Sequence, residues 1–253
     1  MNSIKVIVRE KIALLSLDRG KSNAIDTEMV IELKDMLQNI EKDENITGVI
    51  LTGKDDYFSA GLDLINLYEY SKEQMKNFWG AYLSLIATAV IFKKPLIAAI
   101  NGHTPAAGTV LALCCDYRVM ADGDFNIGLN DVALGIIVPD SFFQLYAAAI
   151  GTQKAKQFIL EAKLMQAKEA LDCALINEMV KKEDVVNAAV RQMQKYLQFN
   201  KNVWQETKLS IRENLIKSVQ LQHTDAIVKI LEEWWSPYNR SILQTIIQNL
   251  KKA

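Results

Sequence analysis

Short apolar runs separated by turn residues dominate the first half of the chain. Residues 4–18, IKVIVREKIALLSLD, form two such runs around a charged stretch, and this pattern predicts a hairpin of two strands. Residues 46–53, ITGVILTG, are rich in β-branched side chains and end in glycine, as a buried strand would. Further strands are expected in 94–102, in 117–122 and in part of 125–137, FNIGLNDVALGII.

Helical spacing of apolar residues appears between and after these strands. In residues 21–44 the apolar positions recur about every three to four residues, and Asp26 or Thr27 can serve as the N-cap. Residues 106–116, AAGTVLALCCD, predict a compact apolar helix after a turn of small residues. From about residue 142 the strand pattern fades, and helices are expected in 141–163, 166–180, 182–200 and 223–252.

Alternating strands and helices indicate an α/β architecture in which helices pack on sheets. Because the later part is helical, we divide the chain into an α/β core over residues 1–195 and a C-terminal helical region over residues 196–253. The aromatic residues of that region are more typical of a core or an interface than of a ligand platform. They are Trp204, Trp234, Trp235 and Tyr238.

The composition and the N-terminal segment argue against several classes of protein. Half of the 253 residues are hydrophobic and the net charge is −1, which provides no general electrostatic case for a nucleic-acid partner. The charged N-terminal segment lacks a signal-peptide core, and no apolar run approaches the roughly 20 residues that span a bilayer. Three cysteines, two histidines and no C-x-x-C pair argue against a disulfide framework and a metal site. These features predict a soluble cytoplasmic protein.

Two turns of small residues follow predicted strands. They lie in residues 55–64, DDYFSAGLDL, and in residues 101–112, NGHTPAAGTVLA. Small residues let a ligand approach the backbone, and a helix N-terminus offers free N–H groups. One N–H from each turn could bind a developing negative oxygen as an oxyanion hole, although on spacing alone ordinary turn formation is the simpler explanation of these small residues.

Three motifs in order resemble the crotonase superfamily, the enoyl-CoA hydratases and isomerases. They are FSAGLDL (58–64), NGHTPAAGTVLALCCDYRVMAD (101–122) and FNIGLNDVALGIIVP (125–139), and the resemblance extends over about residues 4–185. It implies a spiral of repeated ββα units with a C-terminal helical region that builds homotrimers, often paired into hexamers. It also implies an acyl-CoA substrate, with no cofactor beyond the CoA that the substrate carries.

The resemblance assigns the oxyanion hole to two backbone N–H groups, those of Ala60 and Ala107. Relatives usually have glycine at the second position, so alanine is suitable there only if its backbone is not left-handed. The residues around the thioester and CoA would come from the first turn. They are Ser59, Ala60, Gly61, Leu62 and Asp63.

The acidic positions of the family distinguish its reactions. Hydratases use two glutamates to activate a water molecule, and the matching positions in this chain are Val110 and Asp131. Valine cannot exchange protons, whereas one base is enough to move the double bond of a 3-enoyl-CoA to the 2-position.

The motif around Asp131 also resembles the 3,2-enoyl-CoA isomerases, although these normally have glutamate, which is longer by about 1.5 Å. A misplacement of about 1 Å can reduce a rate on the order of a hundredfold. Asn130 is expected to contact the substrate or orient Asp131.

Three further residues near these motifs have simpler interpretations. Asp140 lies near a place where some superfamily members have a catalytic carboxylate, but an N-cap role is favoured. His103 is expected to be a turn or CoA-channel residue, and Asp63 to cap or orient its loop. Other crotonase chemistry, namely hydration or decarboxylation, and a degenerate CoA-binding or scaffolding protein remain alternatives to the isomerase.

Overall fold

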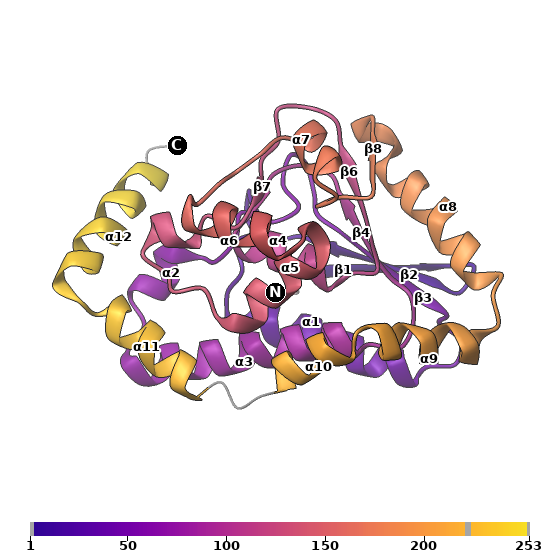
Figure 1. Cartoon of the computed structure of the whole chain (residues 1–253), viewed down its shortest axis with the longest axis horizontal. Coiled ribbons are helices and arrows are strands. Elements are labelled where there is room, and N and C mark those ends of the chain that lie inside the picture. The colour runs from indigo at the N-terminus through magenta and orange to yellow at the C-terminus, as the bar shows by residue number, and fades with distance from the viewer. Residues whose placement is uncertain (1–2, 221–223, 252–253) are drawn as a thin grey trace.

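A parallel-dominated sheet forms the centre of the molecule (Figure 1). A computed structural model describes residues 3–220 and 224–251, and within them six strands lie in the order β1-β2-β3-β4-β6-β8. β1 pairs antiparallel with β2, and the later pairings are parallel. The α/β class and the opening hairpin are thus confirmed. The strands are β1 (Ile4–Arg9), β2 (Ile12–Leu17), β3 (Gly48–Thr52), β4 (Leu96–Ile100), β6 (Tyr117–Ala121) and β8 (Glu178–Val180).

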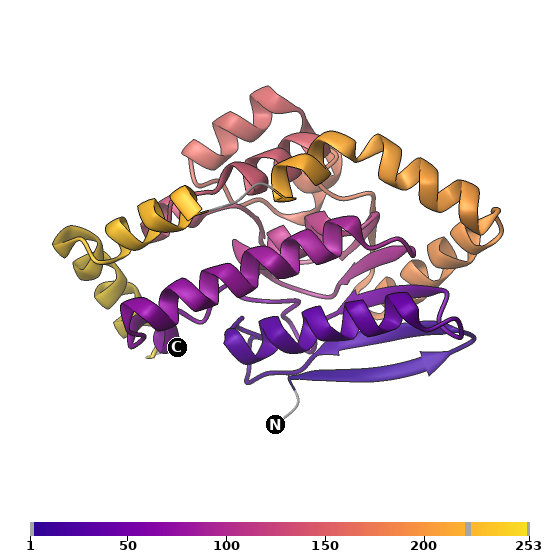
Figure 2. The same cartoon turned by 90° about the horizontal axis from the view of Figure 1, so that it is seen from below.

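Side chains of successive strand residues point to opposite faces of the sheet, and apolar ones point to both. Helices therefore cover both faces. On one face α8 packs its buried residues against apolar side chains of the strands. The other face belongs to the main core, where α1 and α3 lie side by side (Figure 2). The helices of the core are α1 (Thr27–Lys42), α2 (Leu64–Tyr68), α3 (Lys72–Ile91), α4 (Ala107–Cys114), α5 (Asp140–Ile150), α6 (Thr152–Leu160), α7 (Ala167–Asp172) and α8 (Val185–Leu197).

A second, small sheet joins the two motifs that carry the candidate chemistry. β5 (Thr104–Pro105) pairs parallel with β7 (Ile127–Gly128). The Ala106 N–H then donates to the Gly128 carbonyl at 2.8 Å. This pairing places the start of α4 beside the 3₁₀ turn η1 (Asp131–Leu134), which follows β7.

Some local predictions need correction. The predicted helix over 166–180 ends early, because Ala174 has a left-handed φ of 66° and the chain then forms β8 beside β6. The strand expected in 125–137 is only the two residues of β7. The expected elements do not include α3, although Ser71 and Gln74 form a capping box at its start. Asp26 caps α1 as expected, accepting from the Met29 N–H at 2.9 Å.

The described part of the C-terminal region consists of helices joined by short turns. Its helices are α9 (Lys201–Ile211), α10 (Glu213–Gln220), α11 (Thr224–Trp234) and α12 (Pro237–Leu250). The stretch predicted as one helix over 223–252 is divided at Ser236, which caps α12, and residues 223 and 252 lie outside the described residues. The boundary expected between residues 195 and 196 falls within the last turn of α8. Of the four aromatic residues, Trp234 is a core residue, whereas Tyr238 is largely exposed.

Candidate active site

A cavity of about 320 Å³ lies where the two small-residue turns meet η1 and α12. Its wall is mostly apolar, with polar side chains from four residues only among those described, namely Ser22, Asp63, Asn130 and Asp131. The other lining residues are Ala24, Ala60, Leu62, Leu64, Ile65, Pro105, Ala106, Leu134, Ile136, Ile246 and Leu250. An apolar pocket with few polar groups is typical of a small-molecule site.

Asp131 is the buried carboxylate of this cavity. It is the first residue of η1, and 3% of its surface is exposed. Its Oδ2 atom has no hydrogen-bond partner among the described residues. Burial raises the pKa of Asp131 to about 6, and a hydrogen bond from its own backbone N–H opposes part of that rise. The side chain can therefore be ionised at neutral pH and still accept a proton readily.

The turn that carries Asp131 is enclosed by glycine residues with positive φ. Gly128 (φ 143°) ends β7, and Gly135 (φ 70°) ends η1. A Cβ atom at Gly128 would lie 2.3 Å from the Lys163 carbonyl oxygen, so a side chain has no room there. Asn130, between them, also has a buried Oδ1 atom without a partner in the described part of the chain. Asn130 and Asp131 therefore bring two unsatisfied oxygen atoms to the same cavity.

In the first turn, the free donor differs from the expected one. The Ala60 N–H donates to the Ser22 carbonyl at 2.9 Å, so it is already engaged. Leu62 forms a parallel β-bridge with Ile25. In this bridge the Ile25 N–H donates to the Gly61 carbonyl at 2.8 Å, and the Asp63 N–H donates to the Ile25 carbonyl at 2.9 Å. The Leu62 N–H takes no part in this bridge. It has no acceptor among the residues that the structure describes.

The remaining residues of this turn fix its shape. Ser59 is fully buried, and its hydroxyl donates to the Asn23 carbonyl at 2.8 Å while accepting from the Gly61 N–H. Asp63 caps α2 by accepting from the Asn66 N–H at 3.1 Å, and it pairs with the guanidinium of Arg19 at 2.8 Å. The expectation that Asp63 caps its loop is thus confirmed.

The second turn presents Ala107 as the first residue of α4. Ala107 is helical, and the left-handed residue is Ala106, with φ 48° and ψ −120°. Alanine is suitable as the second donor only if its own backbone is not left-handed, and Ala107 meets that condition. Among the described residues the Ala107 N–H has no acceptor, as expected at a helix start. A Cβ atom on Gly61 would lie 3.6 Å from the Ala107 nitrogen, so the two turns are in close contact.

The position expected for a second acid contributes no polar group. Val110 lies on α4, is fully buried and belongs to the apolar core. It is absent from the cavity wall described above. Within the described residues, Asp131 and Asp63 are the cavity's carboxylates, and Asp63 is paired with Arg19. One unpaired base therefore remains.

His103 and Asp140 lie outside the cavity wall. The His103 Nδ1 atom accepts from the Asn126 N–H at 3.1 Å, and its ring packs against Tyr57 and Phe125. Asp140 is exposed and accepts from the Gln144 side chain at 3.1 Å. Pro139, rather than Asp140, is the N-cap of α5, so the expected cap role is corrected to the first helical position.

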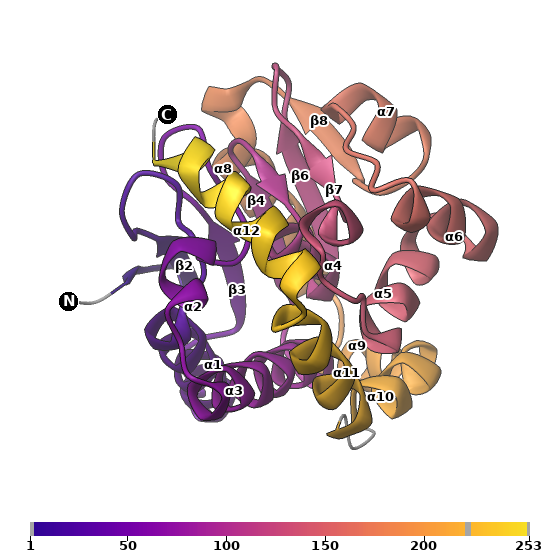
Figure 3. The ribbon, with the colours of Figure 1, turned by 90° about the vertical axis from the view of Figure 1, so that its left-hand side faces the viewer.

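α12 is a further part of the site that no sequence motif indicated. This helix lies beside α2 at one end of the molecule (Figures 1 and 3), and Ile246 and Leu250 line the cavity. The Asn239 side chain donates to the Gly135 carbonyl at 2.9 Å, and Arg240 stacks on Tyr68 at 3.3 Å from the ring centre. No local sequence signal links α12 to residues more than 100 positions earlier.

Comparison with known proteins places the chain among acyl-CoA enzymes. Residues 8–238 match the family model described as enoyl-CoA hydratase/isomerase. The chain is 36% identical to the mitochondrial enoyl-CoA delta isomerase 1 of Mus musculus, over 81% of this chain and 73% of that protein. It is 31% identical to the crotonyl-CoA hydratase of Syntrophomonas wolfei, over 70% and 68%. The solved human mitochondrial delta3-delta2-enoyl-CoA isomerase superposes with a TM-score of 0.95 at 27% identity, covering 99% of both chains.

Proposed function

The chain belongs to the enoyl-CoA hydratase/isomerase family, and we propose that it converts 3-enoyl-CoA thioesters to 2-enoyl-CoA thioesters with Asp131 as the only base. One observation carries this proposal. Asp131 is a buried carboxylate without a hydrogen-bond partner for its Oδ2 atom in the described chain, and it shares its cavity with the two turns. The base therefore faces a place where a thioester oxygen can be bound.

The reaction is a proton transfer in two steps. Asp131 removes a proton from carbon 2, and the electron pair of that C–H bond delocalises into a dienolate with negative charge on the thioester oxygen. The protonated carboxyl group then returns the proton to carbon 4, and the double bond forms between carbons 2 and 3. Because the same proton leaves and returns, the reaction requires no other cofactor.

We assign the oxyanion hole to the N–H groups of Leu62 and Ala107. Both are without an acceptor in the described structure, and the Ala60 N–H is engaged by Ser22. Two fixed donors aimed at the developing charge stabilise a transition state strongly, typically by about 100-fold or more per donor. The N-terminus of α4 adds its positive end to the same place.

Hydratase chemistry is less well supported by the site. Addition of water needs a group that activates the water and a second group that holds it or donates a proton. Val110 cannot fill the second role, and Asp63 is paired with Arg19. Asn130, which has a free carbonyl oxygen, can orient the substrate but cannot exchange protons.

The apolar part of the cavity suits the hydrocarbon chain of the substrate. The side chains of Leu64, Leu134, Ile136 and Ile246 line it. Ligand cavities usually enclose about 300 to 1,000 Å³, so this cavity is at the small end of the range. It favours an acyl chain of short or medium length.

The proposal is tested with 3-hexenoyl-CoA, by following the absorbance of the conjugated 2-enoyl product. The wild type is expected to turn over, and Asp131→Asn to lose about 100-fold or more of kcat. Asp140→Asn is the matched control, because it removes an exposed carboxylate outside the cavity wall. Full activity of Asp131→Asn would refute its role as the base. Rapid hydration of a 2-enoyl-CoA would favour the hydratase, and binding without turnover would favour a degenerate CoA-binding protein.

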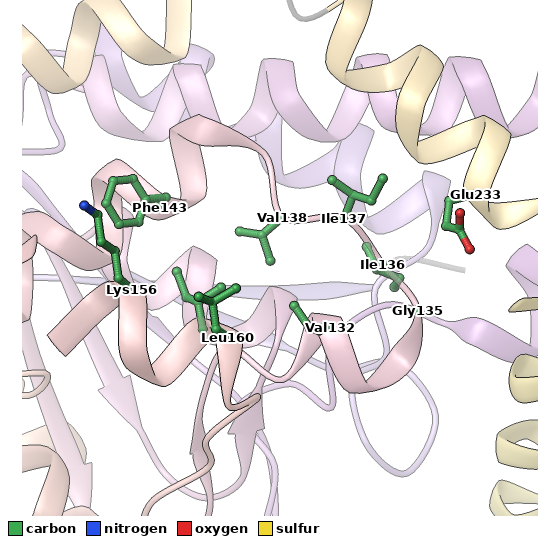
Figure 4. Close-up of a pocket in the computed structure, with 10 residues that line it drawn as sticks. Val132, Gly135, Ile136, Ile137, Val138, Phe143, Lys156, Leu160 and Glu233 are labelled. Atoms are coloured by element: carbon green, nitrogen blue, oxygen red, sulfur yellow. The ribbon is translucent and has the colours of Figure 1, made fainter. Parts of the chain in front are cut away.

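We further propose that the chain forms homotrimers or hexamers. Two apolar surfaces support this assembly. One is a groove of about 590 Å³ whose side chains include Val132, Ile137 and Leu160, exposed by 42 to 76% (Figure 4). The other lies beside α9, where Val203 and Ile211 are exposed by 65 and 79%.

Sedimentation equilibrium tests this assembly and should give the mass of a trimer or hexamer. Leu160→Glu should weaken the association of the subunits, and a monomeric wild type would contradict the assembly.

We also propose a cytoplasmic location. Three free cysteines, two of them buried, support a reducing compartment such as the cytoplasm. No helix within residues 3–220 and 224–251 has the length and apolar character needed to cross a bilayer. Fractionation of cells that express the full-length protein would test the location.

A further inference from the structure

A tyrosine on α3 contacts the residue that carries the second proposed donor. The hydroxyl of Tyr82 donates to the Ala107 carbonyl oxygen at 3.2 Å. Tyr82 is fully buried, and its ring is stacked parallel to that of Phe78 and packs edge-on against Phe142 of α5. The phenol group is therefore held in place by packing, and it is absent from the cavity wall.

The peptide that carries this donor follows a strained residue. The φ of 48° and ψ of −120° at Ala106 lie in a region that alanine rarely adopts. Such strain persists only where surrounding contacts maintain it. The ψ angle of Ala106 also sets the direction of the Ala107 N–H, so relaxation of this residue would rotate the donor away from the thioester oxygen.

Contacts on three sides maintain this conformation. The Ala106 N–H is bonded to the Gly128 carbonyl on the side of β7. Gly61 lies against the turn, where a Cβ atom would be 3.3 Å from the Ala106 Cβ. On the third side, Tyr82 holds the Ala107 carbonyl. Among the described residues, no side chain other than that of Tyr82 forms a hydrogen bond with Ala107.

Tyr82 remains a neutral donor throughout the working pH range. Burial raises its pKa well above the ordinary value, and the negative charge of ionised Asp131 raises it further. Cys114 is the other titratable group that interacts with Tyr82 within the described structure, and burial keeps its thiol neutral. The hydrogen bond to Ala107 therefore does not titrate, and it persists while negative charge moves from Asp131 to the thioester oxygen.

We propose that Tyr82 is a positioning residue of the oxyanion hole, whose hydroxyl orients the Ala107 N–H toward the enolate oxygen. This inference rests on the proposed function, because it presumes an acyl thioester bound at the two turns. It assigns to α3 a role in the chemistry that its core location does not suggest. Removal of the hydroxyl should weaken enolate binding without changing the binding of an acyl thioester that cannot form an enolate readily.

The test compares Tyr82→Phe with Tyr146→Phe. Tyr146 is an equally buried tyrosine on α5, and its hydroxyl has no partner among the described residues and lies outside the cavity wall. Acetoacetyl-CoA, whose enolate absorbs in the near ultraviolet, is titrated with each protein across pH, and butanoyl-CoA binding is measured in parallel. Isomerase kcat and KM are measured with 3-hexenoyl-CoA.

Tyr82→Phe is expected to reduce enolate binding and kcat each by about 10-fold, less than the loss of a whole oxyanion donor. Its KM and its affinity for butanoyl-CoA should stay unchanged, and Tyr146→Phe should match the wild type in every measurement. Equal enolate binding by Tyr82→Phe and the wild type would overturn the inference. So would an equal loss of enolate and butanoyl-CoA binding, or a Tyr82→Phe protein that does not fold, since each indicates a purely structural role. A wild type that binds acetoacetyl-CoA as its enolate but does not isomerise 3-hexenoyl-CoA would instead refute the proposed function alone.

Discussion

At the scale of the residue, the protein keeps a carboxylate in a place that disfavours its charge. Asp131 is 3% exposed, and no cation pairs with it in the described structure. Burial makes the carboxylate a stronger base, but it also makes the ionised folded state less stable. Function and stability therefore depend on the same pKa in opposite directions.

The activity should follow the ionisation of Asp131. Because the base must be ionised, kcat/KM is expected to fall about tenfold for each pH unit below a pKa of about 6. The measurement is a pH profile of 3-hexenoyl-CoA isomerisation in the wild type. An acid limb near pH 4, the ordinary aspartate range, would contradict the buried environment assigned to this carboxylate.

Stability should show the opposite effect. The folded pKa of about 6 lies above the ordinary value of 3.8, so the folded state binds the proton more tightly. Protonated Asp131 therefore stabilises the fold relative to the ionised form, and that contribution is lost as the pH rises from about 4 through 6. Asp131→Asn lacks this loss. From pH 4 to pH 7, its unfolding free energy relative to the wild type should increase by roughly 2 kcal/mol.

Urea unfolding of both proteins at several pH values measures that difference. Asp140→Asn is the control, since it removes an exposed carboxylate outside the cavity wall. A pH-independent difference for Asp131→Asn would show that the folded pKa is not raised.

At the scale of the element, α12 closes the cavity and is attached at two points. Asn239 bonds to the carbonyl of Gly135, and Arg240 donates to the Tyr68 carbonyl at 3.0 Å. Gly135 leaves no space for a side chain, since a Cβ atom would lie 1.6 Å from the Asn239 Oδ1 atom. The helix therefore bridges α2 and η1, and its inner side chains limit the length of the acyl cavity.

Shortening one of these side chains should change the preferred substrate. Ile246→Ala enlarges the cavity, so the ratio of kcat/KM for 3-decenoyl-CoA to that for 3-hexenoyl-CoA is expected to rise by about 10-fold. Ile242→Ala is the matched control, one turn earlier on the same helix and outside the cavity wall. An unchanged ratio in Ile246→Ala would exclude α12 from the choice of chain length.

At the scale of the whole molecule, one buried carboxylate links the C-terminal helices to the α/β core. The two carboxylate oxygens of Asp116 pair with Lys208 at 2.7 Å and with Arg212 at 3.0 Å, both on the C-terminal side of the chain. Asp116 also accepts from the Leu96 N–H at 2.8 Å, at the start of β4. Burial lowers the pKa of Lys208, and the charge of Asp116 opposes that effect.

Removal of this carboxylate should destabilise the whole protein. Asp116→Ala leaves the Lys208 ammonium buried without its partner, and the expected cost is about 3 to 5 kcal/mol of unfolding free energy. Asp56→Ala is the control, because Asp56 and its partner Lys182 are exposed and their separation should have no measurable effect. Urea unfolding of both variants measures the costs. Similar small losses in the two would show that the link to the C-terminal helices is weak.

Much of the fold follows from local sequence patterns. The opening hairpin, α1 with its Asp26 cap, and the buried strands β3 and β4 are confirmed. Helical spacing misled the interpretation near residues 173–180, where pairing with β6 outweighs the local pattern. Family motifs identified Asp131 and the absence of an acid at Val110, because these are properties of residue type alone.

The sequence by itself therefore determined the family, the residue types available for chemistry and most of the secondary structure. Only the tertiary structure decided which groups are free to act. The motif placed a donor at Ala60, but the Ser22 carbonyl engages that N–H and leaves Leu62 free. The role of α12 was equally out of reach. Hydrogen-bond partners, and the burial that shifts a pKa, come from segments far apart in the chain. A local pattern of residues does not specify these long-range contacts.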